Sequence, residues 1–134
     1  MSGQGFSFEA PIGWKVVKQG SSVAATDGSV NRYEVLRFDL EKPYRVARFA
    51  AVSRELDGVA QRLAGQLGGR VTSRSTAVMH GRKSRAYTID YGSGKALQIA
   101  FVLQDQTEYE VLCRRLSSAP ASGCAQLFSS FALS

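Results

Sequence analysis

The chain has 134 residues, a length that suits a single domain (residues 1–134) with its own hydrophobic core. Its composition, 44% apolar and 21% charged, is typical of a globular protein and argues against intrinsic disorder. The formal charge of +6 would favour nonspecific contact with anionic partners, but the basic residues are spread along the chain. We therefore expect a solvated basic surface and no specific nucleic-acid site.

The first five residues, 1–5, lack the charged and apolar regions of a signal peptide. We interpret them as a disordered leader or a cloning remnant. Either the chain is cytoplasmic, or it begins after a removed signal or lipid anchor. No apolar stretch approaches the ~20 residues that cross a bilayer, so membrane contact is expected only through such an anchor.

The first third of the chain predicts short strands separated by turns. Alternating or β-branched residues indicate strands at Phe6–Phe8, Trp14–Lys18, Ser22–Thr26 and Tyr33–Leu40. Pro11 and Gly13 predict a turn between the first two of these strands.

A helix near 53–67 follows, because apolar residues recur there at helical spacing. The apolar stripe comprises Val52, Leu56, Val59, Ala60, Leu63 and Leu67. Gly68 and Gly69 supply the C-terminal cap. The start of the helix is left open, since Val46 and Phe49 extend the stripe toward Pro43.

Four strands in a meander are predicted next, joined by turns of two or three residues that suit antiparallel hairpins. They are expected at residues 70–79, 82–91, 95–104 and 107–115. The turn lengths place Arg74 opposite Tyr87, Arg70 opposite Tyr91, Ile89 opposite Leu97, and Tyr87 opposite Ile99.

This register gives the sheet two different faces. The bulky face contains Val78, Tyr87, Ile89, Leu97, Ile99, Phe101 and Leu103. The small-residue face contains Ala86, Thr88, Ala96, Gln98, Ala100 and Val102. We expect the 53–67 helix on the bulky face.

The two cysteines, Cys113 and Cys124, flank the last turn of the expected fold. Cys113 should lie on the small-residue face, and a C-terminal helix near 120–130 carries Cys124 on its apolar side. A disulfide between them would join that helix to the sheet; the alternative is two free buried cysteines. The disulfide favours an extracytoplasmic location, either secreted, periplasmic or in the cell envelope, over a cytoplasmic one.

Together these elements predict an α+β fold, specifically a three-layer α/β/α arrangement around a central, mainly antiparallel sheet. Helices near 53–67 and 120–130 would form the two outer layers.

The order of the elements resembles the PsbP-like fold family, which includes the PsbP and Mog proteins and bacterial secreted or lipid-anchored relatives. The likeness lies in the opening Phe6–Trp14 with its Pro-x-Gly-Trp turn, in helix Glu55–Leu67 followed by a meander with Gly81 at a hairpin, and in the ending Ser130-Phe131. The resemblance implies a fold and a binding or assembly role rather than an activity.

Motifs for catalysis and metal binding are weak. His80 is the single histidine and is interpreted as a turn residue. Glu108 and Glu110 share a strand face and are interpreted as solvated. We expect no enzyme activity, no catalytic residue, no metal site and no cofactor.

Three functional hypotheses remain. The first is a noncatalytic module that binds a protein partner. The second is a small-ligand carrier or enzyme with a cleft between the sheet and the 53–67 helix. The third is a nucleic-acid surface built from Arg74, Tyr87 and neighbouring Arg and Tyr side chains. A basic patch that would meet an acidic partner is expected from four residues: Arg82, Lys83, Arg114 and Arg115.

Overall fold

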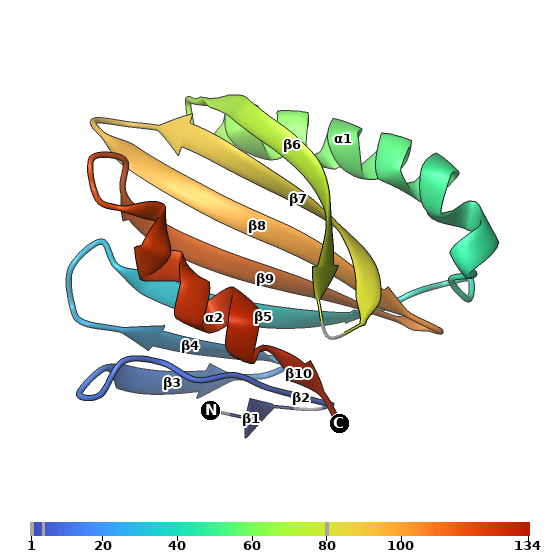
Figure 1. The fold of residues 1–134 in the computed structure, drawn as a ribbon, viewed down its shortest axis with the longest axis horizontal. Coiled ribbons are helices and arrows are strands. Elements are labelled where there is room, and N and C mark those ends of the chain that lie inside the picture. The colour runs from blue at the N-terminus through green and yellow to red at the C-terminus, as the bar shows by residue number, and fades with distance from the viewer. Residues whose placement is uncertain (1, 4, 80) are drawn as a thin grey trace.

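The computed structural model describes residues 2–3, 5–79 and 81–134 (Figure 1). The strands are β1 (Ser2–Gly3), β2 (Phe6–Ser7), β3 (Lys15–Gln19), β4 (Ser22–Thr26), β5 (Arg32–Asp39), β6 (Arg70–Met79), β7 (Arg82–Tyr91), β8 (Lys95–Gln104), β9 (Thr107–Leu116) and β10 (Ala132–Leu133). The helices are α1 (Phe49–Gln66) and α2 (Ala125–Ser130), each preceded by a 3-10 turn, Val46–Arg48 and Ala121–Cys124 respectively.

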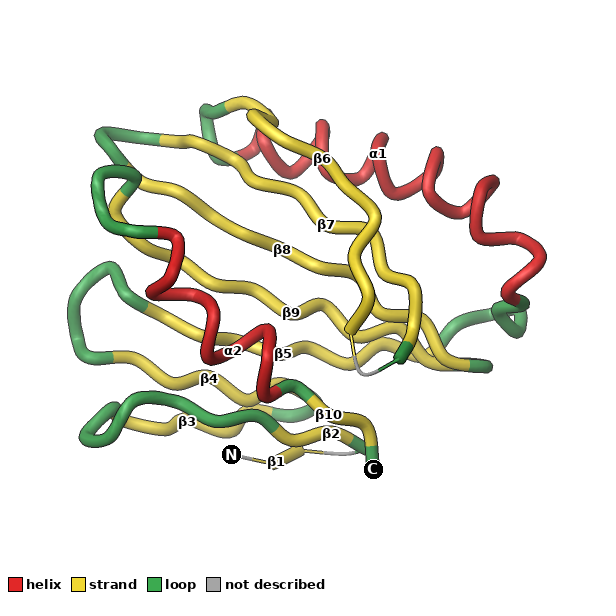
Figure 2. Tube along the Cα trace, in the orientation of Figure 1, coloured by secondary structure: helices red, strands yellow, loops and turns green. Residues whose placement is uncertain are grey.

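Seven strands form one antiparallel sheet in the order β3-β4-β5-β9-β8-β7-β6. A small second sheet, β1-β2-β10, brings the two ends of the chain together. Figure 2 shows the large sheet as a twisted layer, with α1 on one side of it and α2 on the other. The sheet places β6 at one edge and β3 at the opposite edge.

The predicted meander is confirmed nearly to the residue, since tight turns fix strand length and register together. Arg74 lies opposite Tyr87. Ile89 faces Leu97, as expected. The pairing of Arg70 with Tyr91 is wrong, because a bulge between Val71 and Ser73 shifts the register and sets Arg70 opposite Asp90.

The two faces of the sheet carry two separate cores. On the bulky face, α1 buries Leu56, Ala60 and Ala64 against a set of sheet residues: Tyr87, Ile89, Leu97, Ile99, Phe101, Leu103 and Leu112. On the small-residue face, Leu127 and Phe131 pack with the aromatic rings of Phe6 and Tyr109. Small side chains on this face let α2 approach the strands closely.

The three-layer α/β/α prediction is wrong. Strands account for 49% of the chain and helices for 23%, so this is a β-rich fold with two short helices. The helix expected near 120–130 has only six α-helical residues, Ala125–Ser130, and is too short to form a layer over seven strands. Side chains of the N-terminal segment, including Phe6 and Phe8, fill much of that core instead.

The start of the helix near 53–67, which the sequence leaves open, is at Phe49, because the apolar stripe continues backward through its first turn. Two further expectations need correction. Ser2–Gly3 pairs with β2, so the described part of segment 1–5 is not a free leader. Val78 was expected in the bulky core but is 71% exposed, at the end of the edge strand β6.

Among the described residues, neither helix combines the length and the apolar character needed to traverse a lipid bilayer.

Candidate functional site

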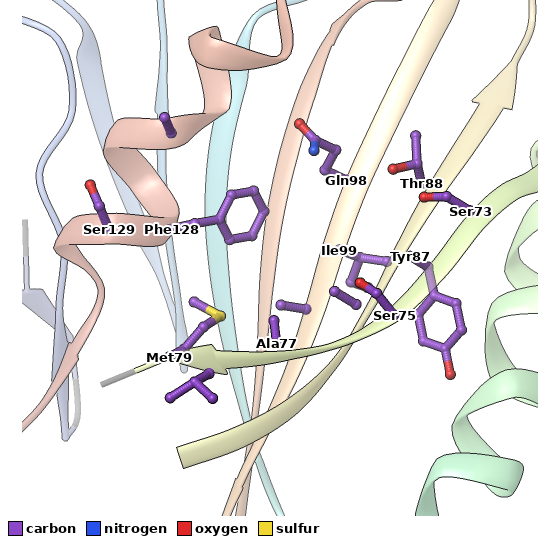
Figure 3. Close-up of a pocket in the computed structure, with 14 residues that line it drawn as sticks. Ser73, Ser75, Ala77, Met79, Tyr87, Thr88, Gln98, Ile99, Phe128 and Ser129 are labelled. Carbon is purple, nitrogen blue, oxygen red and sulfur yellow. The ribbon is translucent and has the colours of Figure 1, made fainter. Parts of the chain in front are cut away.

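A groove of about 500 Å³ lies on the small-residue face, between α2 and strands β6, β7 and β8 (Figure 3). Its floor is formed by Ala77, Ala86 and Ala100, and its apolar walls by Met79 and Phe128. Hydroxyl and amide groups line its polar parts, namely Ser73, Ser75, Thr88, Gln98 and Ser129. We call this the binding groove. Because no charged side chain lines it among the described residues, it suits an uncharged, largely apolar group.

The groove exists because the strands supply small side chains where α2 is too short to cover them. Ala86 lies opposite Ser75 and Ala100, so a row of small residues crosses three strands. Phe128 reaches from α2 into the resulting space, as Figure 3 shows. The small-residue face was predicted from the sequence, but the helix near 120–130 was expected to cover it. No sequence pattern reveals the groove, because apolar spacing shows which side of the C-terminal helix is buried but not how far that helix extends.

The wall of the groove that contains α2 is fixed by a disulfide between Cys113 and Cys124, which confirms the predicted pair. Their Cα atoms are 5.8 Å apart, and the bond joins β9 to the 3-10 turn before α2. The hydroxyl of Tyr33 donates a hydrogen bond to the carbonyl oxygen of Gly123 at 2.6 Å. Arg115 donates to the carbonyl oxygens of Leu116 and Ala119, both at 3.1 Å, and so stabilises the loop between β9 and the 3-10 turn that precedes α2.

On the bulky face, a polar cluster connects α1 to β6 and β7. Asp57 of α1 accepts hydrogen bonds from the Tyr87 hydroxyl at 2.5 Å and from Arg85 Nε at 3.1 Å. Its second oxygen lies 3.8 Å from Arg74 Nη1. The Tyr87 hydrogen bond and the Arg85 guanidinium lower the pKa of Asp57 despite its partial desolvation. Asp57 was not predicted as a site residue, because no sequence pattern distinguishes it from the other polar residues of its helix.

The interpretation of Glu108 and Glu110 as solvated residues is wrong, because both are half-buried on the bulky face. Glu110 lies between Leu36 and Phe101, and Glu108 lies between Phe38 and Leu103. Burial raises the pKa of Glu108. Burial, and then the charges of Glu108 and Glu34, raise the pKa of Glu110 to about 7. Near neutral pH, Glu110 is therefore partly protonated in the folded protein.

Replacement of Glu110 by glutamine should stabilise the protein at pH 8 and have little effect at pH 4.5. The unfolded carboxyl ionises near 4.5 and the folded one near 7, so folding binds a proton between these values and stability falls as the pH rises. Since solvent screens this half-exposed group, we expect a gain of about 1 kcal/mol. Urea unfolding at both pH values measures the effect, with the exposed Glu41→Gln as the control. An equal gain at both pH values would contradict this account.

A second concavity, of about 520 Å³, opens at the start of α1 on the bulky face. Its apolar side is formed by Val52, Leu56, Val59 and Leu103, and its rim by Lys42, Tyr44, Arg45, Arg48, Glu55 and Glu108. This is the cleft between the sheet and the 53–67 helix that the second hypothesis requires. Unlike the binding groove, it is rimmed by charges of both signs.

The four basic residues of the expected patch lie in two pairs. Arg82 and Lys83 lie at the start of β7. Arg114 and Arg115 lie near the opposite end of β7, since Arg114 pairs with Leu97 and Leu97 pairs with Ile89. The structure therefore separates the pairs along the strands and forms no single patch from them. Arg115 is additionally engaged with the loop before α2.

Within residues 2–3, 5–79 and 81–134, no three His, Cys, Asp or Glu side chains are arranged to hold a metal ion. His80 lies outside the described residues, so its interpretation as a turn residue stays a prediction.

Comparison with known proteins gives a likeness of fold. No family model and no curated protein matches the chain. The structure is similar to the crystal structure, at 1.50 Å resolution, of a protein from Bacteroides thetaiotaomicron, with a TM-score of 0.62 and 10% sequence identity. The similarity covers 96% of this chain and 45% of that one, so the chain spans less than half of this neighbour's length. At such low identity, the two proteins share a fold, and nothing further follows about function.

Proposed function

We propose that the chain is a noncatalytic binding or assembly module that receives an apolar, uncharged part of a partner protein in the binding groove. The groove itself is the observation that carries this proposal. Its volume of about 500 Å³ accommodates several side chains, and its lining combines an apolar floor with hydroxyl and amide groups. Its wall at α2 is held by the Cys113–Cys124 bond, so the site is preformed.

We further propose that the protein acts outside the cytoplasm, in a secreted, periplasmic or cell-envelope location. The disulfide supports this location, because structural disulfides persist in oxidising compartments. A removed N-terminal lipid anchor would provide the membrane tether of this proposal.

Membership of the PsbP-like family is also a proposal, and it rests on sequence motifs. The turn at Pro11–Trp14, which contributes one of them, closes through a hydrogen bond from the Trp14 amide to the Pro11 carbonyl oxygen at 3.3 Å. Gly13 there has a φ of 91°, a conformation that favours glycine.

A small-ligand carrier or enzyme is the second candidate, and the cleft at the start of α1 favours it. Tyr44, Arg45 and Arg48 give that cleft donors that would suit an anionic ligand. Nucleic-acid binding receives less support, because Tyr87 is only 3% exposed and its ring is not available for stacking on a base.

A large side chain placed in the binding groove should weaken the binding of apolar probes. We expect Nile red, a neutral dye, to bind the wild-type protein and to bind Ala86→Phe at least tenfold more weakly, since the added ring occupies the floor. Ala50→Phe, the same change at an exposed position of α1, is the matched control. Fluorescence titration measures both affinities, and circular dichroism checks the fold. Equal binding to the two variants, or no binding to the wild type, would overturn the groove as the site.

A further inference from the structure

We propose that the partner binds as an extended segment that adds an eighth strand to the sheet at the free edge of β6. This inference rests on the proposed function and specifies the partner's chemistry. The segment would alternate apolar residues, which enter the binding groove, with acidic residues, which face the bulky side of the sheet.

The first reason is that one edge of β6 is unpaired among the described residues. β6 is ten residues long and pairs only with β7 among the described residues. Every second residue of an edge strand directs its N–H and C=O away from the sheet, where an added strand can pair with them. Beyond the bulge at Val71 and Ser73, the strand runs in regular register from Ser73 to Met79 and contains no proline.

The second reason is the position of the groove along this edge. Ser73, Ser75 and Ala77 are alternate residues of β6, and all three line the binding groove. Residues of an added strand that lie opposite them would share their face of the sheet. Alternate side chains of the partner would therefore enter the groove, while its backbone pairs with β6. Recognition by backbone pairing with pockets for every second side chain is a known mode of peptide binding.

The third reason is charge. Arg74, Lys83 and Arg85 lie on the bulky face of the β6–β7 hairpin, and Asp57 is the carboxylate that pairs with both arginines. The Arg74 side chain is 55% exposed, so it is available to a further carboxylate. The remaining positive charge suits acidic residues on the added strand. It disfavours pairing of β6 with β6 of a second copy, which would bring like charges together.

A labelled peptide tests this inference. The probe is an eight-residue peptide of alternating glutamate and valine, capped at both ends, and fluorescence anisotropy reports its binding. N-methylation of every second backbone nitrogen keeps the side chains and removes hydrogen-bond donors. Two such peptides are made, one for each set of alternate nitrogens, because only one set faces β6. We expect the peptide methylated on the β6-facing nitrogens to bind at least tenfold more weakly. A lysine–valine peptide should also bind more weakly than the glutamate–valine peptide.

Amide hydrogen exchange locates the peptide on the protein. We expect new protection of β6 amides when the peptide binds, while β3, the opposite edge, serves as the internal control and remains unchanged. Thr76→Pro, which removes a backbone donor from β6, should weaken peptide binding and leave Nile red binding unchanged. The exchange experiment decides the question even if that variant fails to fold.

The possible failures are distinguishable. If Nile red binds in the groove but the peptide does not bind, or binds without protecting β6, the edge-strand inference is overturned and the proposed function stands. Undiminished binding of both N-methylated peptides would also overturn it. Protection of β6 that rises with protein concentration in the absence of peptide would show pairing between two copies and would overturn the acidic-partner assignment.

Discussion

Replacement of both cysteines, Cys113→Ala with Cys124→Ala, is expected to lower the free energy of unfolding by about 3 kcal/mol. The cysteines are 11 positions apart, and the cross-link limits the conformations of the unfolded chain between them. The loss should lower Tm by roughly 10 °C. Because the bond also fixes α2 beside the sheet, Nile red should bind the double variant more weakly.

Urea unfolding of the wild-type protein with and without dithiothreitol provides the control. Reduction should lower the free energy of unfolding of the wild-type protein to nearly that of the double variant, and should not change the value for the variant itself. If dithiothreitol leaves the wild type unchanged while the variant loses stability, the loss comes from altered packing of two buried side chains, and the cross-link contributes little. The measurement thus separates covalent from packing effects.

Replacement of Asp57 by alanine is expected to cost about 2 kcal/mol of stability, because hydrogen bonds to a charged group are worth more than neutral ones. The variant leaves the Tyr87 hydroxyl without its acceptor, and because Tyr87 is only 3% exposed, water cannot readily replace that acceptor. It also leaves Arg85, whose side chain is 17% exposed, without its carboxylate. The helix α1 would lose its polar attachment to the meander. Thermal and urea unfolding measure the loss.

The Asp57 prediction has a distinct pH dependence. Since the pKa of Asp57 is lowered in the folded protein, its contribution is present above the usual value of 3.8 and is lost as the pH falls below it. The difference between wild type and Asp57→Ala should therefore shrink on acidification. Glu55→Ala, an exposed position on the same helix, is the matched control and should change stability by less than about 0.5 kcal/mol. A loss that persists undiminished at low pH would contradict the role assigned to the carboxylate.

Much of the fold was predictable because local signals and tertiary packing agree in the meander. Turns of two or three residues fixed the pairing of Ile89 with Leu97, and the pleat then fixed which face each side chain occupies. The position of Cys113 on the small-residue face followed from the same alternation. The disulfide was one of two alternatives for the cysteine pair, and the structure contains it.

The errors arose where tertiary packing, rather than the local sequence pattern, determines register, helix length or burial. The bulge at Val71 carries no turn signal, so the register near Arg70 was wrong. The C-terminal helix was predicted too long because apolar spacing shows which side of a helix is buried but not how far it extends. That same error concealed the binding groove. The burial of Glu110 depends on Leu36 of β5, a neighbour that is remote in sequence and that the meander alone does not bring near.

The short sheet formed by β1, β2 and β10 has a practical consequence. The amide of Ser134 donates to the carbonyl oxygen of Gly5 at 3.0 Å, and Ala132 lies opposite Ser7, so the two terminal segments lie together at one corner with β2 between β1 and β10. Figure 1 shows that corner beside β3, away from the start of β6 at the opposite edge of the large sheet. An affinity tag or a fluorescent protein fused there would leave the start of the β6 edge unobstructed. A circular permutant that joins these ends with a brief linker and opens the chain at Gly92–Gly94 should retain the native topology.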